Sequence, residues 1–179
     1  MSFPSVDALL DSMRRGAGEH DGERIDLLAH MLQCAALLIT AAPDDLELQV
    51  AGLVHDIGTV LEPAGPATHA VTGAAAVEPI LGGRVAALVA GHDQAKRYLV
   101  GTDSEYRAQL SEMSVATLAL QGGVIDEAER TRFEGGEHFD ALVTLRRADD
   151  AAKVPGRSVR DLDDWRPQLE RVAERQSRS

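Results

Sequence analysis

Aromatic residues, cysteine and positive charge are all scarce in this chain of 179 residues. Phe, Trp and Tyr make up 3% of the chain, so the core must be built from Leu, Val, Ile and Ala, a composition that suits closely packed helices. The single cysteine, Cys34, excludes a disulfide within the chain, and its apolar neighbours predict a buried thiol. The net charge of −11 argues against nucleic acid or an anionic membrane as the main partner.

Signals for export, membrane insertion and strands are missing as well. Residues 1–5 lack a signal-peptide pattern, and no apolar run approaches membrane-spanning length, so a cytoplasmic location is expected. No repeat, linker or alternating strand pattern is found. With 44% hydrophobic and 26% charged residues, the chain has the composition of one ordinary globular domain.

One helical pattern after another is present instead. Apolar residues recur at helical spacing behind capping residues such as Ser5 and either Asp44 or Asp45. The ranges predicted to be helical are 6–13, 28–39, 46–54, 70–77, 85–90, 114–120, 126–134, 137–152 and 165–175. The sequence therefore predicts an all-α, single-domain helical bundle over residues 1–179.

The adjacent pair His55-Asp56 is the most informative feature that the chain has. The pair follows an apolar run, and burying an imidazole beside a carboxylate costs free energy unless something compensates. A metal ion compensates, because it binds neutral imidazole and ionised carboxylate together. Consecutive donors diverge around a helix and reach one ion only near a helix end, which Gly58 is expected to supply.

Four further donors follow the same logic at spacings of about one helix or more: His30, His69, His92 and Asp149. A lone histidine on an apolar helix, such as His30, is more often a core residue with one hydrogen bond, and the doublet is what favours ligation. Together the six side chains suffice for two metal ions with open positions, which makes the chain a candidate enzyme. His20 and His138 fall outside the pattern and are expected at the surface.

Asp149 and Asp150 compete for the last ligand position. On a helix they point about 100° apart, so only one of them can face the cluster. The buried face carries Leu142, Leu145 and Ala148, and Asp149 continues it four residues after Leu145. Asp149 is therefore the preferred ligand, and Asp150 is expected to orient a ligand histidine.

Three cations lie one helical turn from these donors: Lys96 after His92, Arg146 before Asp149, and Lys153 after it. Most lysines and arginines are ordinary surface charges. Three of them converging on a metal cluster indicate a small, strongly anionic substrate, for which a phosphonate is suitable. Ser114, at an expected helix start, either adds donors to the same anion or only caps its helix.

The donor set resembles that of the HD-domain superfamily, whose members bind metals inside a helical bundle. The superfamily pattern is matched by His30, His55-Asp56 and Asp149, and the extra ligands of its dinuclear branch by His69 and His92. More narrowly, the chain resembles the small mixed-valent di-iron oxygenases that cleave the carbon–phosphorus bond of organophosphonates. The stretches that carry this resemblance are 30–33, 53–58, 92–99, 120–123 and 145–153.

The resemblance implies an O2-dependent oxygenase that converts a 1-hydroxy-2-aminoethylphosphonate-like substrate to phosphate and a carboxylic acid. Its cofactors would be two iron ions, Fe(II) and Fe(III), with O2 as co-substrate. One iron would be held by His30, His55, Asp56 and Asp149, and the other by His69, His92 and the bridging Asp56. The phosphonate would contact Lys96, Ser114, Arg146 and Lys153, and its amino end would contact Glu23. On this reading the metal-binding core spans about 20–155, and a covering helix spans about 163–175.

Two positions depart from the family pattern. Some relatives place a tyrosine before the first ligand, where it occupies an iron site until substrate arrives. Here His20 stands nearby, so either it takes that gating role or the gate is missing. Thr59 stands four residues after His55, where the best-known relatives carry histidine.

The main alternative is a metal-dependent HD phosphohydrolase acting on a phosphate ester or nucleotide. There, paired divalent ions polarise a phosphate and generate hydroxide from water. The ligands suit both reactions and accept manganese, iron or zinc alike. A non-catalytic regulatory module is less favoured because all six ligands are kept, and monomer and dimer both remain open.

Overall fold

Helices make up every regular element in the part of the chain that the structure describes. This computed structural model describes residues 2–20, 24–61, 65 and 67–178. The helices are α1 (Val6–Arg15), α2 (Leu27–Ala41), α3 (Leu46–Val54), α4 (Ile57–Leu61), α5 (His69–Thr102), α6 (Ser104–Gln109), α7 (Glu112–Leu120), α8 (Glu127–Glu134), α9 (Phe139–Ala151), the short 3-10 helix η1 (Leu162–Trp165) and α10 (Arg166–Gln176). The predicted all-α fold is confirmed.

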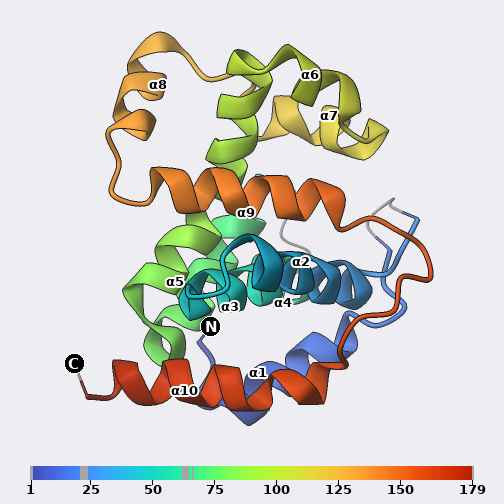
Figure 1. The fold of residues 1–179 in the computed structure, drawn as a ribbon, viewed down its shortest axis with the longest axis vertical. Coiled ribbons are helices and arrows are strands. Elements are labelled where there is room, and N and C mark those ends of the chain that lie inside the picture. The colour runs from blue at the N-terminus through green and yellow to red at the C-terminus, as the bar shows by residue number, and fades with distance from the viewer. Residues whose placement is uncertain (1, 21–23, 62–64, 66, 179) are drawn as a thin grey trace.

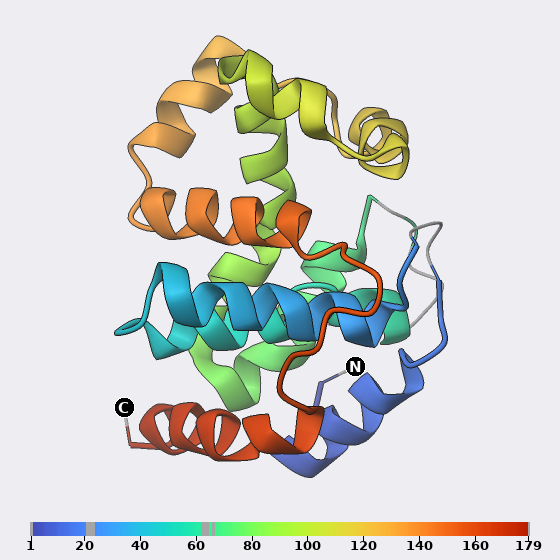
Figure 2. The same ribbon diagram turned by 45° about the vertical axis from the view of Figure 1, so that its right-hand side comes forward.

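The helices are arranged in three levels along the long axis of the molecule (Figure 1). At the bottom, α1 and α10 lie side by side; in the middle, α2, α3, α4 and α9 pack on one another or on α5. The long helix α5 begins in the middle level, reaches down to α10, and then runs up to α6, α7 and α8, which form a cap at the top (Figure 2). The middle level therefore gathers helices that are far apart in the sequence.

Aliphatic side chains fill the middle level, as the scarcity of aromatic residues predicted. Met31 of α2, Leu53 of α3, Leu88 of α5 and Leu145 of α9 are all fully buried in one cluster, and Cys34 is buried among them. Burying each such side chain contributes about 1.5–3 kcal/mol, so this cluster is the main source of stability.

Capping aspartates fix where the two central helices begin. The Asp26 carboxylate accepts a hydrogen bond from the backbone N–H of Ala29 at the start of α2. At the start of α3 the cap is Asp45, one of the two expected candidates, which accepts from the N–H of Leu48. Arg84 of α5 also donates to both oxygens of Asp45 and thereby ties α3 to α5.

Gly58 does not end a helix, so this expectation is wrong. Helix α3 already ends at Val54, and Gly58 lies within α4. A Cβ atom at Gly58 would lie 1.9 Å from the carbonyl oxygen of His69 and 2.8 Å from the backbone nitrogen of Gly73. Glycine is required here because the backbones of α4 and α5 approach so closely.

The two helices expected over 70–77 and 85–90 belong to one element, α5, which continues to Thr102. A kink at Gly82, where φ is 87°, separates its two parts. Gly91 does not stop the helix. Its missing side chain instead makes room for Leu142 of α9, because a Cβ at this position would lie 2.7 Å from Leu142 Cδ2. Helix α6 was not predicted.

By length and composition alone, α5 could cross a membrane, contrary to the expectation that no run approaches such a length. However, 56% of its most apolar 18-residue window is buried inside the protein. The same properties are found in the core helices of soluble proteins, and α5 has that position here. The cytoplasmic location stays a prediction.

Candidate metal centre

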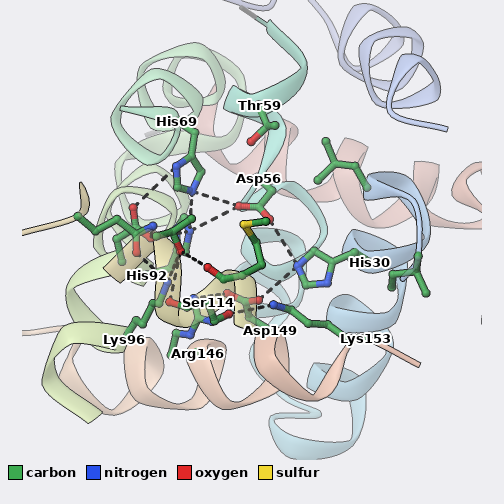
Figure 3. A pocket seen from close by; sticks show the side chains of 16 residues that line it. His30, Asp56, Thr59, His69, His92, Lys96, Ser114, Arg146, Asp149 and Lys153 are labelled. Carbon is green, nitrogen blue, oxygen red and sulfur yellow. Dashed lines mark hydrogen bonds and ion pairs between the residues drawn. The ribbon is translucent and has the colours of Figure 1, made fainter. Parts of the chain in front are cut away.

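All six predicted ligands meet in the middle level, although they come from five parts of the chain. They are His30 in α2, His55 and Asp56 between α3 and α4, His69 and His92 in α5, and Asp149 in α9. In Figure 3, Asp56 lies between His69 and His92 on one side and His30 on the other. The structure therefore brings together the six side chains that the sequence singled out.

The first group of donors surrounds one oxygen of Asp56. Oδ2 of Asp56 lies 3.4 Å from Nε2 of His30 and 3.2 Å from Nε2 of His55, and these two nitrogens are 3.1 Å apart. Asp149 approaches the same nitrogens, at 3.3 Å from His30 and 3.7 Å from His55. Two imidazole nitrogens and two carboxylates thus face a common point.

The second group surrounds the other oxygen of Asp56. Oδ1 lies 3.3 Å from Nε2 of His69 and 3.5 Å from Nε2 of His92, and these two nitrogens are also 3.1 Å apart. Potential ligand atoms of His30, His55 and Asp56 lie within 4.8 Å of one another, as do those of Asp56, His69 and His92. Each trio could hold a metal ion, and the two trios share only Asp56.

Backbone carbonyls orient three of the imidazoles. Nδ1 of His30 faces the carbonyl oxygen of Ala152 at 3.1 Å, and Nδ1 of His55 faces that of Gly52 at 2.9 Å. Nδ1 of His92 faces the carbonyl oxygen of Val89 at 2.7 Å. A carbonyl only accepts, so in each ring Nδ1 carries a proton and donates it, which leaves the lone pair of Nε2 for the centre.

This arrangement is unfavourable without positive charge between the nitrogens. The Nε2 lone pairs of His30 and His55 would point at each other across 3.1 Å, and both rings are buried. A metal ion or a proton between them relieves the repulsion, and a metal ion also satisfies the carboxylates. The donor set therefore fits two metal ions, with imidazole and carboxylate ligands that suit iron, manganese or zinc.

Both buried carboxylates are held in the ionised form that binds metals. Burial by itself would raise the pKa of Asp56, but the charge on His55 and a hydrogen bond from His30 hold it well below its usual range. For Asp149, burial is likewise outweighed by the charge of Arg146 and of His55, so its pKa is also well below normal. These acids stay ionised at neutral pH.

The histidines of the first group attract positive charge for the same reason. Burial disfavours the charged form of His30, but hydrogen bonds to Asp149 and Asp56 raise its pKa to about 9. In the second group, burial lowers the pKa of His92. Protons therefore compete with metal for the first group more strongly than for His92 in the second.

A cavity of about 260 Å³ opens onto the two donor groups. Its lining includes all three predicted cations, Lys96, Arg146 and Lys153, and every predicted ligand except His55, which is fully buried behind it. Lys96, which is 2% exposed, donates from Nζ to Oγ1 of Thr117 at 2.7 Å and to Oε1 of Gln121 at 2.8 Å. Nζ of Lys153 donates to Oγ of Ser114 at 3.1 Å. Positive charge thus gathers over the centre in an acidic protein.

Asp150 does not orient a ligand histidine, so this expectation is wrong. Its carboxylate accepts from Nε and Nη2 of Arg146 and from the hydroxyl of Tyr106, rather than from a ligand histidine. Nη1 of Arg146 lies 2.6 Å from Asp149. Arg146 therefore contacts both neighbouring acids, and Asp149 is the acid that faces the centre, as preferred from the helical spacing.

Four further residues were predicted to belong to the site, and only some of them line the cavity. Ser114 is not the start of α7, because Ser111 caps that helix and accepts from the N–H of Ser114; the buried Ser114 lines the cavity. Thr59 lines the cavity as well. His20 is exposed and is not among the residues that line the cavity. Glu23 lies outside the described residues.

Several cavity residues were missed. Asp93 lines the cavity, and its Oδ1 accepts from Nε2 of Gln121 at 2.6 Å. Thr117 and Gln121 follow Ser114 at three and seven residues, so the helical spacing that identified the cations would have found them. Asp93 directly follows a predicted ligand. The apolar residues that were missed are Ile25, Leu27 and Met113.

Comparison with known proteins agrees with this geometry. The profile of the HD domain family matches residues 27–131. The chain is 33% identical to a hydroxymethylphosphonate dioxygenase of Gimesia maris over 94% of this chain and 88% of that protein. It is 31% identical to a 1-hydroxy-2-(trimethylamino)ethylphosphonate dioxygenase (glycine-betaine-forming) of Leisingera caerulea over 90% of this chain and 86% of that protein. The chain belongs to the HD domain family.

Proposed function

We propose that this protein is an HD-domain oxygenase that cleaves the carbon–phosphorus bond of a small phosphonate. The observation that carries the proposal is the position of Asp56, whose two oxygens face two separate histidine pairs beside a cavity that Lys96, Arg146 and Lys153 also line. Two similar proteins are named as phosphonate dioxygenases, and each is matched over most of its length. That similarity favours oxygenation over hydrolysis.

In this proposal the two donor groups hold two iron ions. His30, His55, Asp56 and Asp149 would hold one iron, and Asp56, His69 and His92 would hold the other. A mixed-valent iron pair supplies the binding and activation of O2 and a Lewis acid for the substrate's oxygens. The protein orients the imidazoles through backbone carbonyls, keeps both acids ionised and leaves the cavity side of the centre open to small molecules.

The cavity residues would bind the phosphonate group. Lys96, Arg146, Lys153 and Ser114 can provide N–H and O–H donors to its oxygens, and such charge-assisted hydrogen bonds are the strong ones. Lys96 already donates two of its three N–H bonds, to Thr117 and Gln121, which aims the third. Holding the phosphonate in this way would direct the neighbouring carbon toward the metals.

The reaction expected is that of a 1-hydroxyalkylphosphonate with O2. The carbon–phosphorus and carbon–hydrogen bonds of the hydroxyl-bearing carbon break, that carbon is oxidised to a carboxylic acid, and phosphate leaves. One molecule of O2 takes up the four electrons and supplies the two added oxygen atoms. The products, RCOOH and phosphate, then account for every atom of the substrate and O2.

The identity of the substrate beyond this class is also a proposal. One similar protein is named for a phosphonate without an amino group and the other for one with a trimethylamino group. We propose a 1-hydroxy-2-aminoethylphosphonate-like substrate, whose amino end contacts Glu23. Thr59, in the cavity wall, would shape the space beside the metals, and His20 is the proposed gating residue.

The proposal treats residues 1–179 as one HD domain. Its metal-binding core would span about 20–155, covered by a helix at about 163–175, which corresponds to α10 (Arg166–Gln176) packed on α1, α3 and α5. A cytoplasmic location and either a monomer or a dimer go with it.

Oxygen consumption measured together with phosphate release tests the proposal. Protein loaded with iron under anaerobic conditions would be mixed with O2 and hydroxymethylphosphonate, 1-hydroxy-2-aminoethylphosphonate or its trimethylated form. Equal amounts of O2 consumed and phosphate released from at least one of them is the expected result. Phosphate released from a phosphate ester without O2 uptake would instead support the hydrolase.

A further inference from the structure

A series of ion-paired and hydrogen-bonded side chains runs from Asp149, in the candidate metal centre, to a tyrosine in the cap. Nη1 of Arg146 contacts Asp149 at 2.6 Å, and Nε and Nη2 of Arg146 both donate to Asp150, from Nε at 2.8 Å. The hydroxyl of Tyr106 lies 2.5 Å from Oδ2 of Asp150 and 3.1 Å from Nε of Arg146. The order is therefore Asp149, Arg146, Asp150, Tyr106.

Asp150 holds the guanidinium of Arg146 in one plane. Asp149 and Asp150 follow Arg146 on α9 by three and four residues, so both can reach it from the next turn of the helix, one from each side. Asp149 alone contacts one nitrogen of the guanidinium and would leave it free to turn. The paired contact with Asp150 is bidentate, which fixes the orientation as well as the position of the group.

Tyr106 is the member of this series that comes from outside α9. It lies on α6, is 7% exposed, and packs with Leu99 and Val100 of α5. An ionised carboxylate accepts hydrogen bonds only, so the Tyr106 hydroxyl donates to Asp150. A rigid phenol anchored in a second apolar cluster thus sets the position of Asp150, which in turn sets that of Arg146.

Two of the five N–H groups of Arg146, one on Nε and one on Nη2, donate to Asp150, and Nη1 forms an ion pair with Asp149. Arg146 is 4% exposed and lines the cavity. Where its remaining N–H groups point depends on how these contacts hold the guanidinium. Asp149 and Asp150 both attract the positive charge of Arg146. The attraction to Asp150 limits how far the guanidinium moves toward Asp149.

We propose that Tyr106 is a positioning residue for the anion-binding cavity: through Asp150 it orients the guanidinium of Arg146 toward the substrate's phosphonate group. This inference rests on the proposed anion-binding role of Arg146. Tyr106 lies outside the lining of the cavity, so its effect reaches the substrate only through these two side chains.

The other tyrosine of the chain provides a matched control. Tyr98 also donates its hydroxyl to a carboxylate, that of Glu134, at 3.1 Å, and its ring packs on Phe133 and Phe139. This hydrogen bond is exposed, and the half-buried Tyr98 does not line the cavity. Tyr106→Phe and Tyr98→Phe therefore each remove one tyrosine–carboxylate hydrogen bond and keep the ring.

The experiment measures phosphate binding and turnover separately, on iron-loaded full-length protein. Inorganic phosphate binding is measured by calorimetry, and KM and kcat are measured with hydroxymethylphosphonate and O2. For Tyr106→Phe we expect about 3- to 10-fold weaker phosphate binding, the loss expected for one hydrogen bond, a matching rise in KM and an unchanged iron content. Tyr98→Phe should match the unchanged protein in all of these.

A double-mutant comparison separates positioning from a general structural effect. In an Arg146→Lys background the bidentate contact is gone, so adding Tyr106→Phe should weaken phosphate binding no further. Asp150→Asn serves as a second background with the same expectation. Equal losses with and without these changes would overturn the inference, as would unchanged phosphate binding in Tyr106→Phe. If the unchanged protein binds phosphate but turns over none of the phosphonates, the proposed function fails. The phosphate-binding measurements on the variants would still test the role of Tyr106.

Discussion

The parts of this centre that we propose to face the metals and the substrate are built in different ways. Imidazoles on the metal side are buried in the aliphatic middle level and fixed by backbone carbonyls. On the substrate side, Lys96 and Lys153 are held by hydroxyl and amide groups of α7. The apolar side chains on the outer face of α7 are exposed, 53% for Val115 and 61% for Leu120. The side-chain contacts that hold Lys96 and Lys153 can therefore change without movement of the helices that carry the candidate ligands.

If the proposed function holds, this difference would let related proteins share a reaction but differ in substrate. The two similar proteins are named for phosphonates of unequal size and charge. Backbone carbonyls fix the ligand geometry whatever the neighbouring side chains are, whereas the cavity wall consists of side chains that substitution can replace. Thr59 in the wall, where the resemblance leads one to expect histidine, is such a replacement.

The largest effect should come from the residue that both metal groups share. Asp56→Ala removes one oxygen from each group, so we expect both iron ions to be lost or weakly bound and activity to fall on the order of 1,000-fold. Iron content by metal analysis and O2 uptake would measure this. A variant that keeps two irons and full activity would show that Asp56 does not bridge them.

Disturbing the backbone contact between α4 and α5 at Gly58 should weaken metal binding, whereas the same change at Gly83 should not. In Gly58→Ala the new Cβ would meet the carbonyl oxygen of His69, so α4 and α5 must separate, at about 1–3 kcal/mol of stability or more. We expect weaker binding of the metal held by His69 and His92, measured by thermal unfolding and metal titration. Gly83→Ala is the control, because nothing lies within 4 Å of its Cβ, and it should match the unchanged protein.

On the substrate side, removing a cation should affect the anion and spare the metals. Lys96→Met keeps the length of the buried side chain but removes its charge, so phosphate binding should weaken about 10- to 100-fold with iron content unchanged. Calorimetry and metal analysis of the same sample would measure both. Lys153→Ala should behave similarly but more weakly. Iron loss in either variant would show that these cations also support metal binding, which contradicts the expected separation of anion-binding from metal-binding residues.

The smallest effect concerns pH. Burial and the neighbouring charge of Arg146 lower the pKa of Lys96 to about 8. The charged ammonium is present below that pH and is lost as pH rises through it, so phosphate binding should decline above about pH 8. The decline should disappear in Lys96→Met. A pH profile of phosphate affinity that is identical in both proteins would assign the titration to another group.

The sequence predicted the helical fold and singled out a set of His and Asp side chains that lie together, because both follow from local patterns. Apolar residues at helical spacing identify helices, and a His-Asp doublet after an apolar run points to a metal wherever the other ligands come from. The family resemblance then grouped ligands that are distant in the sequence, and the structure brings them together. Spacing along α9 alone also favoured Asp149 over Asp150.

Close approaches between helices could not be predicted in this way. Gly58 and Gly91 look like helix stops, but each one allows another helix to come near, a property of the partner rather than of the local sequence. For the same reason the partner of Asp150 was missed: Tyr106 is 44 residues away, on a helix that was not predicted. Asp93 and Gln121 face the cavity only because α7 folds over α5.

The location of bound metal tests the central claim most directly. A crystal of the iron-loaded protein, with anomalous diffraction recorded at the iron edge, should show two peaks, one beside His30 and His55 and the other beside His69 and His92. Asp56 should bridge them. A single peak, or iron bound elsewhere with Asp56 in contact with none, would contradict the account.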